Sequence, residues 1–483
     1  MSLRTRDAVG AALFWAFVAL LVWVPIPLGS NRPWAWMVLE VWAYALLALW
    51  LIAWALGAVP LTDALRRAWP AWMLLGAWLA LQFLQLVALP PSWVAVLSPE
   101  AARMHALAAQ AGMSQRSVTL SIDPHASWVS LYKSLAYAAI FLLALVLLAR
   151  RSRVLGLARV LVYAAVAISV YAVLLHLGDV NEEWFGTMLT QSESASGTYA
   201  NRNHFAGYLE MMLALGIGLL IAGLSDRSSD SWKRFLRHAV DWVLSPKMIL
   251  RLALCVLVIA LTTTHSRMGN TAFFSSLLLA GVVGIALSRH ATRNTVILLA
   301  SLIAIDLFIV GSWFGVEKLA QRLEQTTARD VQVREEPSAY TLSLIRDYAV
   351  FGSGAGTFHV AFPRYRPPSV AYFFDYTHND YVQFASESGI PGFLVLGGFV
   401  VLSLGAAVVA QLRRRDPLMR GMSFACIMGV TSILIHSWVD FNLQIPANAA
   451  LFMVLLALGW ISLFLDRREG SANATLAHTR MVD

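Results

Sequence analysis

Three short polar motifs carry the side chains of this chain that are best suited to phosphate binding and acid–base chemistry. They are Ala-Asn-Arg-Asn-His at 200–204, His-Ser-Arg-Met-Gly at 265–269 and Thr-His-Asn-Asp at 377–380. An arginine guanidinium matches the geometry of phosphate oxygens. A histidine titrates near neutral pH and can act as a general base. Together these residue types suit a reaction on an anionic substrate that is carried by a lipid.

His378 is the candidate general base. It closes a long polar segment just before an expected membrane span, and Asn379 or Asp380 beside it could hold the imidazole in one tautomer. The alternative is a histidine that caps a helix or lies at the membrane interface without a chemical role. We predict that His378 removes a proton from an attacking hydroxyl group.

Arg202 and Arg267 are the candidates for binding an anionic group. Arg202 lies between two asparagines at the start of an expected span, and Arg267 is the charged residue of a short turn between two spans. An arginine at a membrane boundary is often only an interfacial anchor. However, both lie on the face that is otherwise poor in basic residues, and an arginine that its own turn does not neutralise is a functional candidate.

Further polar residues near these motifs are candidate substrate contacts: Asn201, Asn203, His204, His265, Asn379, Asp380, Arg364, Arg366 and Asp440. His436 and Asp440 are four positions apart and share one helical face if the helix continues between them. A purely structural turn between the last two spans is an equal alternative. The sequence leaves open whether Arg346, Arg364 or Arg366 join the site.

Other kinds of site find little support in the sequence. Gly352-x-Gly354-x-Gly356 follows no expected strand, so we predict a sharply turning loop rather than a nucleotide site. We find no carboxylate pair, zinc-ligand spacing or nucleophile elbow, and Cys255 and Cys426 each lie in an apolar stretch. We therefore expect neither a metal ion nor a cofactor.

The elements that must position these motifs are membrane spans. The chain has 483 residues, of which 58% are hydrophobic and only 13% charged, and its mean hydropathy is +0.64. A soluble protein of this size needs more charge to cover its surface. We predict an all-α polytopic membrane protein with about twelve transmembrane helices. They are expected near residues 8–28, 35–57, 70–89, 127–149, 154–177, 205–224, 249–264, 271–288, 294–312, 390–411, 418–436 and 447–465.

The basic residues orient these spans. With this number of spans, the loops that are rich in Lys and Arg all fall on one side, together with both termini. By the positive-inside rule that side is the cytoplasm, and the three motifs lie on the opposite face. The net charge of +8 is explained by these loops, so we expect a lipid bilayer and no nucleic acid as partner.

The expected organisation has four parts. Residues 1–312 hold transmembrane helices 1–9, 313–389 form a large outer loop that carries the catalytic histidine, 390–465 hold helices 10–12, and 466–483 form a cytoplasmic tail. A loop as long as the second part is usually functional in a compact protein. Its beginning, 316–334, has the pattern of an amphipathic helix at the membrane surface.

The motifs, their order and their common side resemble the superfamily of O-antigen ligases and O-antigen polysaccharide polymerases of bacterial envelopes. The resemblance rests on Ser-Ile-Asp-Pro at 121–124, Tyr-Ala-Asn-Arg-Asn-His at 199–204, His-Ser-Arg-Met-Gly, Gly-Ser-Gly-Ala-Gly-Thr-Phe at 352–358, Thr-His-Asn-Asp-Tyr and Val-Asp-Phe-Asn-Leu-Gln-Ile-Pro at 439–446. It implies a GT-C-like glycosyltransferase of the bacterial inner membrane. Its active site would lie on the periplasmic side, and both termini in the cytoplasm.

The resemblance also implies a substrate and a mechanism. The donor is a glycan on undecaprenyl pyrophosphate, and the acceptor is a sugar hydroxyl of lipid A–core or of a growing glycan. Arg202 and Arg267 would bind the pyrophosphate, and His378 would deprotonate the acceptor in an inverting transfer without a metal ion. The oligomeric state stays open.

The branch within the superfamily also stays open. The ligase pattern of His-Asn followed about ten positions later by Gly fits His378 and Gly389, but Ile390-Pro391-Gly392 replaces the Thr-Gly that should follow. The polymerase pattern, an arginine with a glycine eleven residues later, is met neither at Arg202 nor at Arg267. This mildly favours a ligase.

Two alternatives lie outside these branches. A protein O-oligosaccharyltransferase would use the same donor with a serine as acceptor. A transporter of lipid-linked sugars belongs to a different class and should carry polar residues deep inside several spans. We expect charges there only at Arg159 and Asp306, which favours an enzyme at one membrane face.

Overall fold

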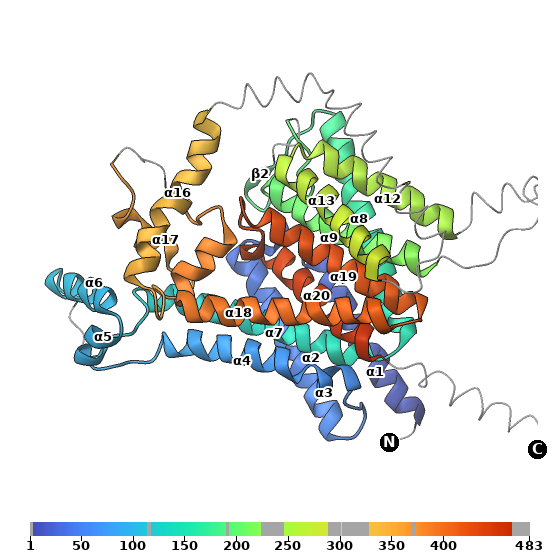
Figure 1. The fold of residues 1–483 in the computed structure, drawn as a ribbon, viewed down its shortest axis with the longest axis horizontal. Coiled ribbons are helices and arrows are strands. Elements are labelled where there is room, and N and C mark those ends of the chain that lie inside the picture. The colour runs from blue at the N-terminus through green and yellow to red at the C-terminus, as the bar shows by residue number, and fades with distance from the viewer. Residues whose placement is uncertain are drawn as a thin grey trace, which may run out of the picture.

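The computed structural model describes residues 3–113, 117–189, 193–223, 246–287, 301, 328–368 and 373–465, and most of these are helical (Figure 1). Within this part of the chain, eight helices are long and apolar enough to span a membrane: α1 (Leu3–Trp23), α2 (Pro33–Ala55), α7 (Pro124–Leu147), α8 (Arg151–Leu177), α9 (Arg202–Ala222), α18 (Asp380–Arg413), α19 (Pro417–His436) and α20 (Pro446–Phe464). Further apolar helices are α4 (Trp69–Leu84), α12 (Pro246–Thr263) and α13 (Arg267–Leu287). The prediction of a helical, polytopic membrane protein is confirmed.

Further elements join these helices. They are α3 (Asp63–Arg67), α5 (Pro91–Leu97), α6 (Pro99–Gln110), α16 (Ala328–Asp347), α17 (Phe358–Ala361), the short 3-10 helices η1 (Leu28–Ser30), η2 (Phe362–Arg364) and η3 (Asn442–Gln444), and the antiparallel pair β1 (Glu182–Trp184) and β2 (Thr187–Leu189). Each expected span except the ninth coincides with a helix. Apart from residue 301, the ninth span (294–312) lies outside the described residues, as does 316–327 of the expected amphipathic helix.

Two helices form the centre of the bundle because they are apolar on all sides. Nearly every residue of α9 and α20 is buried, as expected for a helix without a polar face. α19 packs against α9, α13 and α20, while α4 and α7 pack on the other side, against α18 and α20 (Figure 1). α18 and α20 therefore separate the α4–α7 side from the α9–α13 side.

Small residues allow the tightest of these contacts. A Cβ atom at Gly218 in α9 would overlap the carbonyl oxygen of Gly421 in α19, and a Cβ at Gly421 would overlap the carbonyl of Gly218. Membrane helices gain most from such close packing, because lipid offers no hydrophobic driving force between them. The α9–α19 pair thus forms a rigid base for the residues at its ends.

The basic residues meet at one end of the bundle. Arg150 forms an ion pair with Asp7 at 2.6 Å, Arg151 pairs with Asp416, and the Arg414 Nε donates to the carbonyl of Ser462 at 2.9 Å. The three polar motifs lie at the other end, where α9, α13 and α18 begin. The separation of basic loops from polar motifs, expected from the sequence, is present in the fold.

The outer segments 90–126 and 328–368 pack together beyond this second end. They share a small core that includes Val94, Leu120, Leu344 and Tyr348. The large loop expected at 313–389 is therefore, where it is described, helical and packed rather than extended.

The glycine-rich segment 352–356 clamps this outer part to α18. All three of its glycines have positive φ (72°, 115° and 75°), which confirms a sharply turning loop. α18 itself bends at Gly389 (φ 69°, ψ 172°), one residue before the predicted start of the tenth span at Ile390. A Cβ at Gly352 would overlap the carbonyl of Glu387, and a Cβ at Gly389 would overlap the carbonyl of Val350.

Replacing Gly352 by alanine is therefore expected to destabilise the protein strongly. Left-handed backbone alone costs a non-glycine residue about 1–2 kcal/mol, and the overlap with the Glu387 carbonyl adds to this cost. Gly57 is the matched control, because it has φ 68° and no atom within 4 Å of an added Cβ. Thermal unfolding in detergent should show a larger loss for Gly352→Ala than for Gly57→Ala, and equal losses would contradict the clamp.

Candidate active site

A polar cavity of about 490 Å³ lies where the motifs at 200–204 and 377–380 come together. Its lining comes from four distant segments and consists of Asn31, Ala200, Asn201, His204, Phe373, Phe374, Asp375, Tyr376, His378 and Phe441. We call it the polar cavity. Of the expected site residues, it brings together His378, Asn201 and His204.

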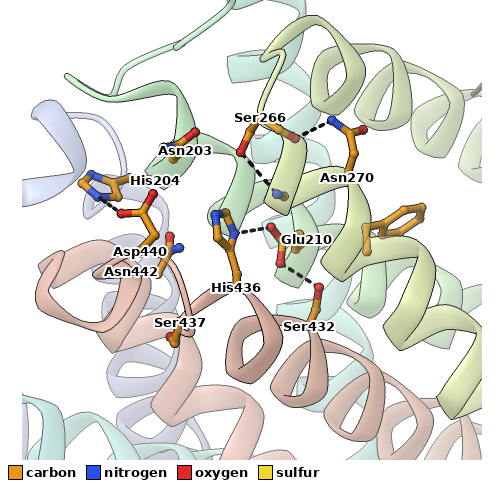
Figure 2. Close-up of polar contacts among 12 residues, drawn as sticks. Asn203, His204, Glu210, Ser266, Asn270, Ser432, His436, Ser437, Asp440 and Asn442 are labelled. Carbon is orange, nitrogen blue, oxygen red and sulfur yellow. Dashed lines mark hydrogen bonds and ion pairs between the residues drawn. The ribbon is translucent and has the colours of Figure 1, made fainter. Parts of the chain in front are cut away.

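The two histidines of the polar cavity flank one aromatic ring. The ring centroids of His204 and His378 lie 4.6 Å and 4.9 Å from that of Phe441. His204 is also paired with a carboxylate: its Nε2 lies 3.3 Å from the Oδ1 of Asp440 (Figure 2). Both partners are buried, at 5% and 2% exposure. Asp440, expected as a substrate contact, thus reaches the cavity through His204.

Asp440 stays a carboxylate at neutral pH. Its burial acts against the charged form, but the contact with the His204 imidazole, with a smaller contribution from His436, outweighs it and holds the pKa of Asp440 below its usual range. A carboxylate in this position fixes the orientation of the imidazole, as in other histidine–carboxylate pairs.

His378 is held in an unusual backbone conformation. Its φ is 54°, in the left-handed region that costs a non-glycine residue energy. Its neighbours stabilise the turn, because the Thr377 hydroxyl donates to the Asn379 carbonyl at 2.6 Å and the Asn379 amide donates to the Trp438 carbonyl at 2.9 Å. The side chain of Asn379 is therefore engaged within the protein, while the half-buried His378 faces the cavity.

Asp380 lies in the wall behind the polar cavity. It is 1% exposed, and its Oδ2 accepts hydrogen bonds from the Ser437 hydroxyl at 2.7 Å and from the Leu443 amide at 3.0 Å. Asp380 thereby ties the start of α18 to residues 437–444, which we call the 437–444 loop. Its carboxylate is occupied by these partners.

Arg202 and Arg267 begin adjacent helices beside the polar cavity without lining it. Asn201 caps α9, since its side chain accepts from the Asn203 amide at 2.8 Å. Arg202 is half-buried and Arg267 exposed. The first turns of α9 and α13 are in contact, because a Cβ at Gly269 would meet the side chain of Ala206. Two arginines at two helix N-termini form a region of positive potential that suits an anion.

The remaining candidates lie apart from the polar cavity. His265 has φ 52° and its Nδ1 lies 3.2 Å from the Glu193 carbonyl. Arg364 forms an ion pair with Glu100 of α6 and so belongs to the outer segments. Arg346 lies in the last turn of α16, and neither it nor Arg366 is among the described residues that line the cavity.

Sequence reasoning missed a buried acidic group beneath the site. Glu210 in α9 is 0% exposed, its Oε1 lies 2.7 Å from His436 Nδ1, and its Oε2 accepts from the Ser432 hydroxyl at 2.7 Å (Figure 2). His436 and Asp440 do not share a helical face, because α19 ends at His436. They contact Glu210 and His204, respectively.

The expectation of few charges inside the spans was wrong. Glu40 in α2, Lys133 in α7 and Glu210 in α9 lie within helices that are long enough to cross a membrane, whereas Asp306 lies outside the described residues. These residues could have been identified in the sequence, since an ionisable residue inside an expected span is a functional candidate by default. The argument against a transporter is weaker as a result.

Comparison with known families gives one match. Residues 252–397 match the family model described as O-Antigen ligase. The chain carries an O-antigen ligase family domain. This confirms the resemblance to the O-antigen ligase and polymerase superfamily, and the domain contains Arg267, Gly352 and His378. Among curated proteins, no significant match to the chain is found.

The family match indicates a general function for the chain. The match of residues 252–397 to the O-antigen ligase family model and the apolar helices indicate a glycan-transferring membrane protein of polysaccharide assembly in bacteria. The matched segment ends before the 437–444 loop and begins after α9. His204, Glu210 and Asp440 therefore lie outside the ligase-family domain but pack against it.

Proposed function

We propose that this chain transfers a glycan from undecaprenyl pyrophosphate to a hydroxyl group of an acceptor sugar. The observation that carries the proposal is the polar cavity, because it places His378 and the His204–Asp440 pair together beside the N-termini that bear Arg202 and Arg267. The ligase-family domain supports a glycan as the transferred group.

The reaction is an inverting substitution at C1 of the donor sugar. The acceptor hydroxyl attacks C1 while the bond from C1 to the pyrophosphate oxygen breaks. The proton of the hydroxyl passes to His378, and undecaprenyl pyrophosphate leaves with the electrons of the broken bond. General-base assistance of this kind contributes about 10²–10⁴-fold in rate.

The arginines would carry the electrostatic part of catalysis. Negative charge grows on the pyrophosphate as its bond to the sugar breaks, and fixed cations near that charge lower the barrier. Arg202 and Arg267 would supply them from the starts of α9 and α13, so that the transfer needs no metal ion. The pyrophosphate would reach them on the periplasmic face, with the basic loops in the cytoplasm.

The acceptor decides the branch within the superfamily. Lipid A–core would make the enzyme a ligase, the end of a growing lipid-linked glycan would make it a polymerase, and a protein serine would make it an O-oligosaccharyltransferase. The polar cavity fits a sugar in each case, since it offers amide, carboxylate, imidazole and aromatic groups.

Transfer with the purified protein in nanodiscs tests the proposal. A lipid-pyrophosphate glycan donor is mixed with each acceptor separately, with and without EDTA. We expect transfer to one acceptor class at a rate that EDTA leaves unchanged. Loss of activity with EDTA that is restored by Mg²⁺ would overturn the metal-free mechanism. Donor binding without transfer to any acceptor would favour the transporter instead.

A further inference from the structure

The polar cavity has a carboxylate in its lining, and neither lysine nor arginine is among the described residues that line it. The carboxylate belongs to Asp375, which is exposed. The other polar groups of the lining are amides, imidazoles and a phenol, from Asn31, Asn201, His204, His378 and Tyr376. The charge of the cavity therefore depends on Asp375 and on the state of the two histidines.

The two histidines do not reverse the charge of Asp375. The His204 Nε2 lies 3.3 Å from the Asp440 carboxylate, so a positive charge on this ring is balanced within the pair. His378 has to be neutral in order to accept a proton from the acceptor hydroxyl. In the form that supports transfer, the described lining is therefore negative.

The phenol and amides of the cavity are uncharged. Burial and three nearby carboxyl groups raise the pKa of Tyr376 above its usual range, so this side chain stays protonated. Asn201 uses its side-chain carbonyl to accept from the Asn203 amide at 2.8 Å, so its NH2 group is the part that suits a ligand. Neutral groups of this kind match the hydroxyl groups of a sugar.

Phe373 is the most exposed aromatic side chain of the cavity. It lines the polar cavity and is 69% exposed. Neighbouring rings are already packed, because the centroid of Phe441 lies 4.6 Å from that of Tyr376 and the centroid of Phe374 lies 5.9 Å from that of Phe362. An accessible aromatic ring beside polar groups suits a sugar, whose ring has an apolar C–H face and a polar edge.

The arginines of the proposed mechanism lie outside this cavity. Arg202 and Arg267 begin α9 and α13 and do not line it. In the proposed reaction they bind the pyrophosphate, whose negative charge offsets theirs. An acidic acceptor would meet both the Asp375 carboxylate and the bound pyrophosphate. Like charges placed close together are unfavourable, so the cavity disfavours such an acceptor.

We propose that Phe373 and Asp375 determine the acceptor specificity of this chain and select an uncharged terminal sugar. The sugar ring packs on Phe373, its hydroxyl groups donate to Asp375, and a sugar with a carboxylate or phosphate group is repelled. The volume of about 490 Å³ is in the range of pockets for small ligands. This inference rests on the proposed glycan transfer and deepens it, because it names the class of acceptor.

Saturation-transfer NMR measures sugar binding to the purified full-length protein in nanodiscs without any transfer reaction. The probes are the methyl glycosides of glucose, galactose and mannose, and those of the matching uronic acids, which carry a carboxylate at C6. Asp179→Asn and Phe185→Ala are the matched controls. Both side chains are exposed, and neither lines the polar cavity.

We expect a signal from the neutral glycosides and none from the uronic acids on the wild type and on both control variants. Phe373→Ala should remove the neutral signal, and Asp375→Asn should allow the uronic acids to bind. Equal signals from the two sets on the wild type, no signal from either set, or a neutral signal that survives Phe373→Ala would overturn the proposal.

Transfer kinetics measure the size of the effect. The acceptor is offered with its terminal sugar either neutral or oxidised to the uronic acid. Asp375→Asn should lower the ratio of kcat/KM for the neutral form to kcat/KM for the acidic form by about fivefold, as expected for two unit charges ~4 Å apart in water. Salt screens exposed charges, so this change should shrink at about 1 M salt, whereas a merely structural effect would persist.

The same assay separates this inference from the proposed function. If transfer proceeds to an acidic terminal sugar, or if Asp375→Asn leaves the ratio unchanged, the specificity assignment is wrong and the proposed function stands. If the neutral glycosides bind as expected but no acceptor is glycosylated, the sugar site stands and the proposed function is wrong.

Discussion

Replacing His378 by alanine is expected to lower the rate of glycan transfer by about 10²–10⁴-fold, the usual contribution of a general base. The imidazole lines the polar cavity, and hydrogen bonds of Thr377 and Asn379 hold the turn around it. The substitution should therefore leave the fold and donor binding intact. The measurement is the single-turnover rate in nanodiscs, with donor saturating.

His204→Ala is the matched comparison for this prediction. His204 lines the same cavity and contacts the same Phe441 ring, but it is held by Asp440. A role in orienting the acceptor predicts a smaller loss of rate and a higher KM. If His204→Ala and Asp440→Asn abolish transfer while His378→Ala keeps it, the base is the His204–Asp440 pair and the assignment of His378 is wrong.

Replacing Glu210 by alanine is expected to reduce the free energy of unfolding by about 3–5 kcal/mol, the usual cost of removing one partner of a buried ionic pair. The carboxylate of Glu210 joins α9 to His436 and Ser432 of α19. Its loss leaves the imidazole of His436 buried without this partner. Glu210→Gln keeps the shape and one acceptor oxygen, so it should lose less. Thermal unfolding in detergent measures both.

Glu183→Ala is the control for Glu210→Ala. Glu183 is exposed in β1 and should change the unfolding temperature little. Glu210 also acts on the site from a distance, because His436 is directly followed by the 437–444 loop. Folded Glu210→Gln protein should therefore transfer glycan more slowly at unchanged donor binding. Equal unfolding temperatures for Glu210→Ala and Glu183→Ala would contradict a structural role.

Much of this architecture could be predicted from apolar runs and basic loops. The span at 205–224 is apolar enough to place α9 within a few residues, and the motif at 200–204 then falls at its start. Long hydrophobic runs and loop charges report the spans and their direction, because the bilayer imposes both. They say little about which helices become neighbours.

The composition of the site could not be predicted for that reason. His204 and Asp440 meet only because α9 packs on α19 and the chain turns back after His436. A helix continuing through Asp440 was an equal alternative, and it would have turned the carboxylate elsewhere. Arg364 and Arg202 were both candidate site residues in the sequence, yet the pairing of Arg364 with Glu100 depends on the packing of segment 90–126, which contains α6, against 328–368.

The bend at Gly389 has a mechanical consequence. The amide of Ile390 donates to the Ala349 carbonyl at 2.8 Å, and the amide of Ser353 donates to the Ser386 carbonyl at 2.9 Å, so the outer two turns of α18 are held by the external segment. A span tilts to match the thickness of its bilayer. We therefore expect a change in the tilt of 390–413 to be taken up at the bend, so that the reacting groups keep their positions when the lipid composition of the membrane changes.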